Sequence, residues 1–281
     1  AASDVYKRQQ ERLECKGYDT AYELFRALAW CKYNDSAVRM KDVVYAYAQD
    51  EMSQGEYQTA LDALRQLTDY PAAEEPIREC RYQLAMQAEN NGQYAQAYAE
   101  YIDLGEYKDC ADKAARFENE YAAASALLAE GEYDNAKSAF EALKDYADAE
   151  KMAKESVYQK GKKQFADGLF AEAEATFDTL GEYSDTKEQI LAIGEHYYAT
   201  RQYEQAEAIY VKVSAAQQLY ELGQYYESQD DLPNAIRVYG EAGTYENAQN
   251  KVTVLQREED YRTAEALCQG CLLYTSDAAE T

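Results

Sequence analysis

Between residues 10 and 270 the apolar positions recur at intervals of three and four residues, which is the period of an amphipathic helix. The recurring pattern is Gly-x-Tyr-x-x-Ala-x-x-x-[Phe/Tyr/Leu]-x-x-Leu-x-x-Tyr-x-[Asp/Asn]-small, with complete copies that begin at Gly92 and Gly131. Successive alanines of the pattern are 39, 37, 39, 37, 33, 29 and 29 residues apart, a period typical of stacked helical hairpins. These alanines are Ala21, Ala60, Ala97, Ala136, Ala173, Ala206, Ala235 and Ala264, the last in a copy that begins at Tyr261.

Each copy predicts two antiparallel helices joined by a short turn. The glycine before the second helix suits a left-handed turn residue. A small residue stands seven positions before that glycine, where we expect the two helices of a hairpin to approach closely: Ala48, Ala85, Ala124, Gly161, Gly194 and Gly223. We expect the side chain that ends the Tyr-x-[Asp/Asn] run to cap the next helix, at Asp109, Asp148, Asp185 and Asn247.

The predicted fold is all-α, an α-solenoid of about seven stacked antiparallel hairpins. The small residue of the first helix and the Gly-x-Tyr-x-x-Ala-x-x-x-[Tyr/Phe] run resemble the tetratricopeptide repeat family over nearly all of residues 16–267. The resemblance implies a right-handed superhelix whose first helices line a concave, protein-binding groove. Three departures predict an irregular pitch: the first-helix tryptophan is missing, Tyr-x-Asp replaces the usual terminal proline, and the unit length drifts from 39 to 29 residues. Similar Tyr-x-Asp repeats occur in long bacterial proteins with zinc-ribbon, membrane or kinase parts.

The two ends of the chain resemble translated sequencing adaptors. One codon choice for residues 271–279, reverse-complemented and read in a shifted frame, encodes residues 1–9. We therefore expect residues 1–9 and 271–281 to be non-native tails, and residues 10–270 to be a bacterial metagenomic fragment truncated at both ends. On this interpretation the Cys268-x-x-Cys271 spacing is accidental, and flanking domains, targeting signals or a membrane anchor would have been lost.

The acidic composition narrows the partners that we expect. The formal net charge is −25, which disfavours nucleic acid and anionic membranes, and no run is apolar enough to insert directly into a bilayer. The cysteines show no paired or metal-binding spacing, which gives a slight preference for a reducing, cytoplasmic compartment. The 29 tyrosines are an unusual excess that needs a structural or functional role.

The sequence shows no catalytic motif. His196 is the single histidine, and neither a phosphate-binding loop nor an H-E-x-x-H run is present. We therefore expect no enzyme activity, no catalytic residue, no metal site and no cofactor.

Two columns on the predicted first helices form the candidate site. The aromatic column stands ten residues before the glycine position, and an acidic column lies three residues earlier on the same helix face. Through the resemblance, both columns would face the groove and bind an extended basic peptide. The alternative is that the tyrosines pack between helices while the acids favour the helix dipoles. The residues are Tyr45, Tyr82, Tyr121, Tyr158 and Tyr220, with Asp42, Glu79, Glu118, Glu155 and Glu188.

The sequence therefore predicts a non-catalytic protein-interaction scaffold that binds a protein or a basic peptide. Two other hypotheses stay open. The repeats form an accessory arm of a larger enzyme, sensor or membrane protein, or they bind glycans, because tyrosines beside carboxylates also suit sugar stacking.

Overall fold

A computed structural model describes residues 17–32 and 35–277, which divide into two compact units at Ala153. The helices of the first unit are α2 (Tyr18–Trp30), α3 (Ser36–Gln54), α4 (Tyr57–Leu64), the short 3-10 helix η1 (Pro71–Ala73), α5 (Glu74–Asn90), α6 (Tyr94–Leu104), α7 (Cys110–Ala129) and α8 (Tyr133–Ala142). Helix α9 (Ala149–Ala166) contains the division. The second unit continues with α10 (Phe170–Asp178), α11 (Thr186–Ala199), α12 (Tyr203–Lys212), α13 (Ala216–Ser228), α14 (Leu232–Glu241) and α15 (Ala248–Asp277).

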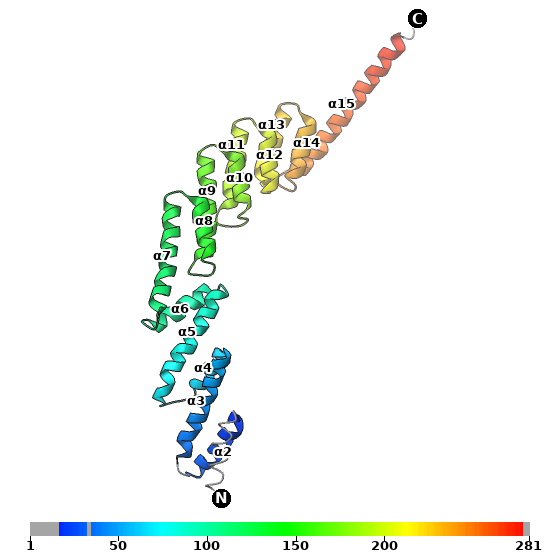
Figure 1. Cartoon of the computed structure of the whole chain (residues 1–281). Helices are drawn as coiled ribbons and strands as arrows, with labels where there is room; N and C mark the ends of the chain where they lie inside the picture. Colours follow the sequence, from blue (N-terminus) through cyan, green and yellow to red (C-terminus); the bar gives the residue numbers. More distant parts are fainter. Residues whose placement is uncertain (1–16, 33–34, 278–281) are drawn as a thin grey trace. The chain divides into compact units, whose positions relative to one another are not determined.

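Within each unit, successive helices pack against one another as antiparallel pairs (Figure 1). The pairs α3/α4, α5/α6 and α7/α8 lie in the first unit, and α11/α12 and α13/α14 lie in the second. Helix α9 packs on α10 through Tyr158 and Phe177, whose ring centroids are 5.9 Å apart. The described residues therefore hold six complete hairpins, preceded by α2 and followed by α15. This confirms the predicted all-α hairpin architecture.

The predicted left-handed turn residues occur in both strict and loose copies of the repeat. Gly55 and Gly131 have φ of 83° and 82°. The loose copies place Arg201 and Asp230 at the same turn position, with φ of 63° and 61°. The turn geometry is therefore kept even where glycine is missing. Packing of the two helices must then offset the cost of a left-handed backbone conformation at a residue other than glycine.

The small residues of the hairpins lie where the helices approach most closely. The pattern alanines from Ala21 to Ala235 have no exposed surface. A Cβ atom at Gly161 would lie 2.6 Å from the ring of Phe177, and one at Gly223 would lie 2.8 Å from the ring of Tyr239. The helices thus pack at a distance that only alanine or glycine permits, as predicted.

In two of the hairpins a buried tyrosine belongs to a polar triad of tyrosine, glutamate and lysine. Tyr101, with no exposed surface, donates to Glu89 Oε2 at 2.6 Å, and Lys113 Nζ lies 3.3 Å from the same oxygen. In the second unit, Tyr239 and Lys251 each lie 2.8 Å from Glu227. The hairpin after Tyr101 has an apolar version at the equivalent positions: Phe140, Leu128 and Met152. These positions are therefore filled by a hydrogen-bonded polar set around Tyr101 and Tyr239 and by an apolar set around Phe140.

The prediction of a further second helix beginning at Tyr261 was wrong. Helix α15 runs without interruption from Ala248 to Asp277, and both Tyr261 and Ala264 are exposed on it. Glu259 occupies the position of the turn glycine, and no left-handed residue interrupts the helix there. The predicted tail 1–9 lies outside the described residues, whereas α15 continues into the predicted tail 271–281.

Candidate protein-interaction surfaces

The aromatic and acidic columns of the first helices form crossed pairs with the Tyr-x-[Asp/Asn] run that follows their hairpin. The hydroxyl of Tyr158 donates to Asp185 Oδ1, and the hydroxyl of Tyr183 donates back to Glu155 Oε2 at 2.9 Å. The rings of Tyr158 and Tyr183 meet edge to face with centroids 6.2 Å apart. One tyrosine and one acid of α9 are thereby tied to one acid and one tyrosine that precede α11. We call such an arrangement a Tyr–acid clasp.

The Tyr–acid clasp recurs with variations along the chain. Tyr121 donates to Asp148 Oδ1, and Tyr220 donates to Asn247 Oδ1. Bonds of the return kind are Tyr107 to Glu79 Oε2 at 2.8 Å and Tyr70 to Asp42 Oδ1 at 3.0 Å. Glu118 differs, because it accepts from Tyr98 of α6 at 2.7 Å. The structure thus gives most predicted site residues a partner within the chain.

The column residues differ in exposure. Tyr82 and Tyr158 are buried, with 9% and 7% of their surfaces exposed, whereas Tyr45, Tyr121 and Tyr220 are half-buried. Asp42, Glu79 and Glu155 are also half-buried, whereas Glu118 and Glu188 are exposed. Glu188 belongs to the unit in which Leu191 replaces the tyrosine, and the structure records no hydrogen bond or ion pair for its side chain among the described residues. The packing alternative thus accounts for the geometry of Tyr82 and Tyr158.

The clasps shift the acidity of their members in opposite directions. Burial and the bond to Asp185 raise the pKa of Tyr158 to about 12, and burial and the bond to Asp109 do the same for Tyr82. The bond from Tyr158 in turn lowers the pKa of Asp185. For Glu79, burial opposes ionisation, but hydrogen bonds from Lys108, Gln83 and Tyr107 lower its pKa overall. The bond between Tyr158 and Asp185 therefore favours a neutral tyrosine beside a charged carboxylate.

The expected capping role of the Tyr-x-Asp acids was only partly right. Asp109 and Asp185 do occupy the N-cap positions of α7 and α11, but neither side chain bonds the backbone of its helix. The Asp185 carboxylate instead accepts from Tyr158. The Asp185 side chain is thus held by the preceding hairpin. Asp231 is the ordinary N-cap of α14, because its side chain accepts a hydrogen bond from Asn234 N at 3.4 Å.

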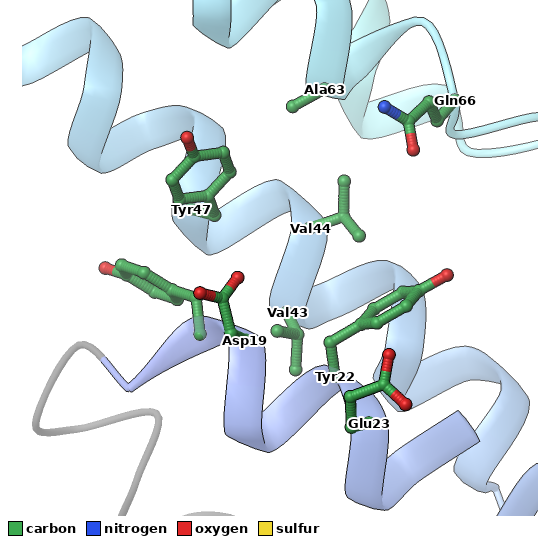
Figure 2. Close-up of a pocket in the computed structure, with 9 residues that line it drawn as sticks. Asp19, Tyr22, Glu23, Val43, Val44, Tyr47, Ala63 and Gln66 are labelled. Carbon is green, nitrogen blue, oxygen red and sulfur yellow. The ribbon is translucent and has the colours of Figure 1, made fainter. Parts of the chain in front are cut away.

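A separate groove, which we call the tyrosine groove, lies between α2, α3 and α4. Its volume is about 370 Å³, and Figure 2 shows acids and aromatic rings bordering it, with Val43 and Val44 on α3 behind them. The residues that line it are Tyr18, Asp19, Tyr22, Glu23, Val43, Val44, Tyr47, Ala63 and Gln66. The groove therefore combines aromatic and aliphatic surface with carboxylates. The sequence predicted the pairing of tyrosines with carboxylates for the two columns of the first helices, but other residues form it here.

The tyrosine groove is electronegative and partly free of internal bonds. Asp19 and Glu23 are exposed, and Glu23 lies 2.5 Å from Arg26 on the side of α2. Burial, Glu51 and Asp19 raise the pKa of Tyr47, in that order. The hydroxyl of half-buried Tyr22 has no hydrogen bond to another described residue. The groove therefore offers a polar group and a negative potential to a ligand.

Sequence reasoning did not select this groove. The signal was present, because Tyr18 and Tyr22 are four residues apart, as are Asp19 and Glu23. That spacing places each pair on one side of a helix. Both pairs lie on the second helix of a hairpin, whereas the resemblance to tetratricopeptide repeats implies a groove lined by first helices.

The described residues contain no group of three or more His, Cys, Asp and Glu side chains that could hold a metal ion. His196 stacks on Phe170 with ring centroids 3.9 Å apart. Across the described helices, none is both long enough and apolar enough to span a bilayer.

Comparison with known proteins gives matches only among solved structures. No family model and no curated protein matches the chain. The C-terminal part of a TPR repeat-containing protein from Cytophaga hutchinsonii is 14% identical, with 88% of this chain and 99% of that chain covered and a TM-score of 0.23. The P58(IPK) TPR domain is 13% identical, with 92% and 79% covered and a TM-score of 0.23. A tetratricopeptide repeat protein from Parabacteroides merdae is 14% identical, with 90% and 98% covered and a TM-score of 0.20. The packing of successive helices in the structure itself establishes the all-α hairpin fold.

Proposed function

We propose that this chain is a non-catalytic interaction scaffold that binds an extended basic peptide segment, with the tyrosine groove as the primary site. The observation that carries the proposal is the convergence of Tyr18, Tyr22 and Tyr47 with the exposed carboxylates of Asp19 and Glu23. Tyrosine rings give broad contact at a low entropic cost, and their hydroxyls bond to peptide groups. A lysine or arginine side chain would find carboxylates at the edge of the groove and aromatic faces within it.

The acidic surface supports a basic partner more generally. A formal net charge of −25 attracts cationic segments and accelerates their encounter. The acidic column on the first helices is the alternative site, and exposed Glu118 and Glu188 are its most accessible members. The buried tyrosines of that column are already engaged in clasps, so a partner there would rely on charge more than on aromatic contact.

Binding of a fluorescent decapeptide that alternates lysine and glycine tests the proposal. The double variant Asp19→Asn, Glu23→Gln should weaken binding about tenfold, or roughly 1.4 kcal/mol, the size of two partly screened ion pairs. Glu130→Gln with Glu204→Gln is the matched control, because it removes the same charge from exposed residues outside the groove. Equal effects of the two double variants would show that only the overall charge matters and would contradict a site in the groove.

The triple variant Glu79→Gln, Glu118→Gln, Glu155→Gln separates the two sites. We expect the loss of affinity per removed charge to be no larger in this triple variant than in the control double variant. If it abolishes binding while the groove variant does not, the partner lies on the first helices, as the sequence predicted.

Salt dependence separates a peptide partner from a glycan. Binding of the basic peptide should weaken steeply as salt rises, because screening acts on ion pairs. Sugar stacking on tyrosine would respond little to salt. Tight binding of neutral oligosaccharides with a flat salt profile would favour the glycan hypothesis.

A further inference from the structure

A second groove, which we call the amide groove, lies between α4, α5 and α6. Its volume is about 270 Å³. Aligning the repeats by their pattern alanines and turn glycines makes the two grooves equivalent. Asp19, Tyr22, Val44, Tyr47 and Ala63 of the tyrosine groove correspond to Gln58, Leu61, Arg81, Leu84 and Glu100 of the amide groove. Equivalent positions of successive repeats thus hold different side chains in the two grooves.

The amide groove contains a cation, Arg65, that no acid among the described residues pairs with. Arg65, at the end of α4, is exposed and forms no ion pair with another described residue. Asp62 on the same helix instead accepts from Gln58 at 3.0 Å. Arg81 is engaged internally, with Glu100 at 2.8 Å and with Asp103. In a chain of net charge −25, an arginine without an internal acid is available to an external one.

Four amide side chains line the same groove as Arg65. Gln87, Asn91, Gln93 and Gln96 all line it, and within the described part of the chain none of their side chains has a recorded hydrogen bond. Each amide offers both donors and an acceptor. Such a set suits the peptide groups of an extended segment, while the planar guanidinium of Arg65 suits a carboxylate.

The two grooves meet at α4 and the turn that follows it: Ala63 and Gln66 line the tyrosine groove, whereas Leu61 and Arg65 line the amide groove. We propose that the amide groove binds an acidic side chain of the same extended segment whose basic residue occupies the tyrosine groove. This inference rests on the proposed function. A helix with its side chains is about 10 Å wide, and an extended peptide advances about 3.3 Å per residue. The partner therefore carries a basic and an acidic residue about three positions apart.

Peptides of fixed length that differ only in their charged residues test the inference. One peptide has a single lysine pair, and a second adds a glutamate three positions after it. A third places the glutamate three positions before the lysines, and a fourth places it seven positions away. The second or the third should bind the intact chain at least fivefold more tightly than the lysine-only peptide. The fourth should bind more weakly than the lysine-only peptide, because its glutamate meets the acidic surface.

The variant Arg65→Gln should abolish this gain and leave binding of the lysine-only peptide unchanged. Arg257→Gln, which removes another exposed arginine, from α15, is the matched control and should keep the gain. If the glutamate never strengthens binding, or if Arg65→Gln keeps the gain, the inference is overturned while the basic-peptide site stands. If the lysine-only peptide fails to bind at all, the proposed function itself is wrong. Circular dichroism of each variant confirms that the helices are intact.

Discussion

The hydroxyl of Tyr158 on α9 donates a hydrogen bond to Asp185, the N-cap residue of α11, 27 residues further along the chain. The bond joins a first helix to the start of the next hairpin. A second bond runs in the opposite direction, from the hydroxyl of Tyr183 to Glu155. Tyr183 lies two residues before Asp185, and Glu155 lies three residues before Tyr158. The fold therefore uses the tyrosine excess, at least in part, to couple neighbouring repeats.

Tyr158→Phe should lower the free energy of unfolding by roughly 1.5 kcal/mol, the lower end for a hydrogen bond to a charged group. The ring stays in place, so the loss reports on the hydroxyl alone. Urea unfolding of Tyr158→Phe, Asp185→Asn and the double variant gives the coupling energy. Tyr261→Phe, on an exposed side chain of α15, is the control and should change nothing. A coupling energy near zero would mean that the clasp does not contribute to stability.

Exchanging one polar triad for its apolar counterpart should be tolerated only as a set. Glu89→Leu alone leaves the buried hydroxyl of Tyr101 without its acceptor and removes the carboxylate that Lys113 and Arg116 share, which should cost roughly 1–3 kcal/mol. The triple variant Glu89→Leu, Tyr101→Phe, Lys113→Met reproduces the Leu128, Phe140, Met152 set of the next hairpin. It should recover most of that loss. Thermal or urea unfolding measures both, and a triple variant less stable than the single one would refute the matched-set interpretation.

Two glycines in the α13/α14 hairpin should respond to alanine in opposite ways. At Gly223 the added Cβ would lie 2.8 Å from the ring of Tyr239, so Gly223→Ala should destabilise by roughly 1–3 kcal/mol through overpacking. At Gly240, in the last turn of α14, a Cβ meets nothing within 4 Å. Gly240→Ala should therefore stabilise by about 0.5–1 kcal/mol, because alanine favours the helix. Unfolding curves that shift in the same direction for both variants would contradict the packing described here.

Stability should fall between pH 10 and pH 12. The bond to Asp148 and burial raise the pKa of Tyr121 to about 12, and burial and the bond to Asp185 raise the pKa of Tyr158 to about 12, above the unfolded value near 10. A raised pKa means that the folded state holds the proton more tightly, so the stabilisation is complete below pH 10 and is lost as the pH rises through 12. Absorbance of tyrosinate should show the exposed tyrosines ionising first, with these two ionising as the chain unfolds. Ionisation of all tyrosines in one step near pH 10, with the helices intact, would contradict the assignment.

Much of the fold followed from the sequence because hairpin formation depends on local properties. The spacing of apolar positions defines a helix face, and glycine permits the left-handed turn. The small residues opposite Phe177 and Tyr239 mark the close approach of two helices that are neighbours in sequence. Each of these features involves residues within one hairpin, so the repeat pattern was sufficient to predict them. The same reasoning failed at Tyr261, where the alanine and tyrosine of the pattern recur without the turn residue.

The sequence placed Tyr158 and Glu155 on one face of a helix but did not choose between a ligand and the chain itself as their partner. Their partners, Asp185 and Tyr183, come within reach only when the next hairpin packs, because the contact depends on the angle and register between hairpins. The grooves beside α4 have the same origin. Tyr22, Val44 and Ala63 lie on three helices, and only the packing of those helices brings them to one groove. The sequence by itself therefore determined the helices and their pairing, whereas the tertiary structure decided which polar side chains are engaged internally and which face outward.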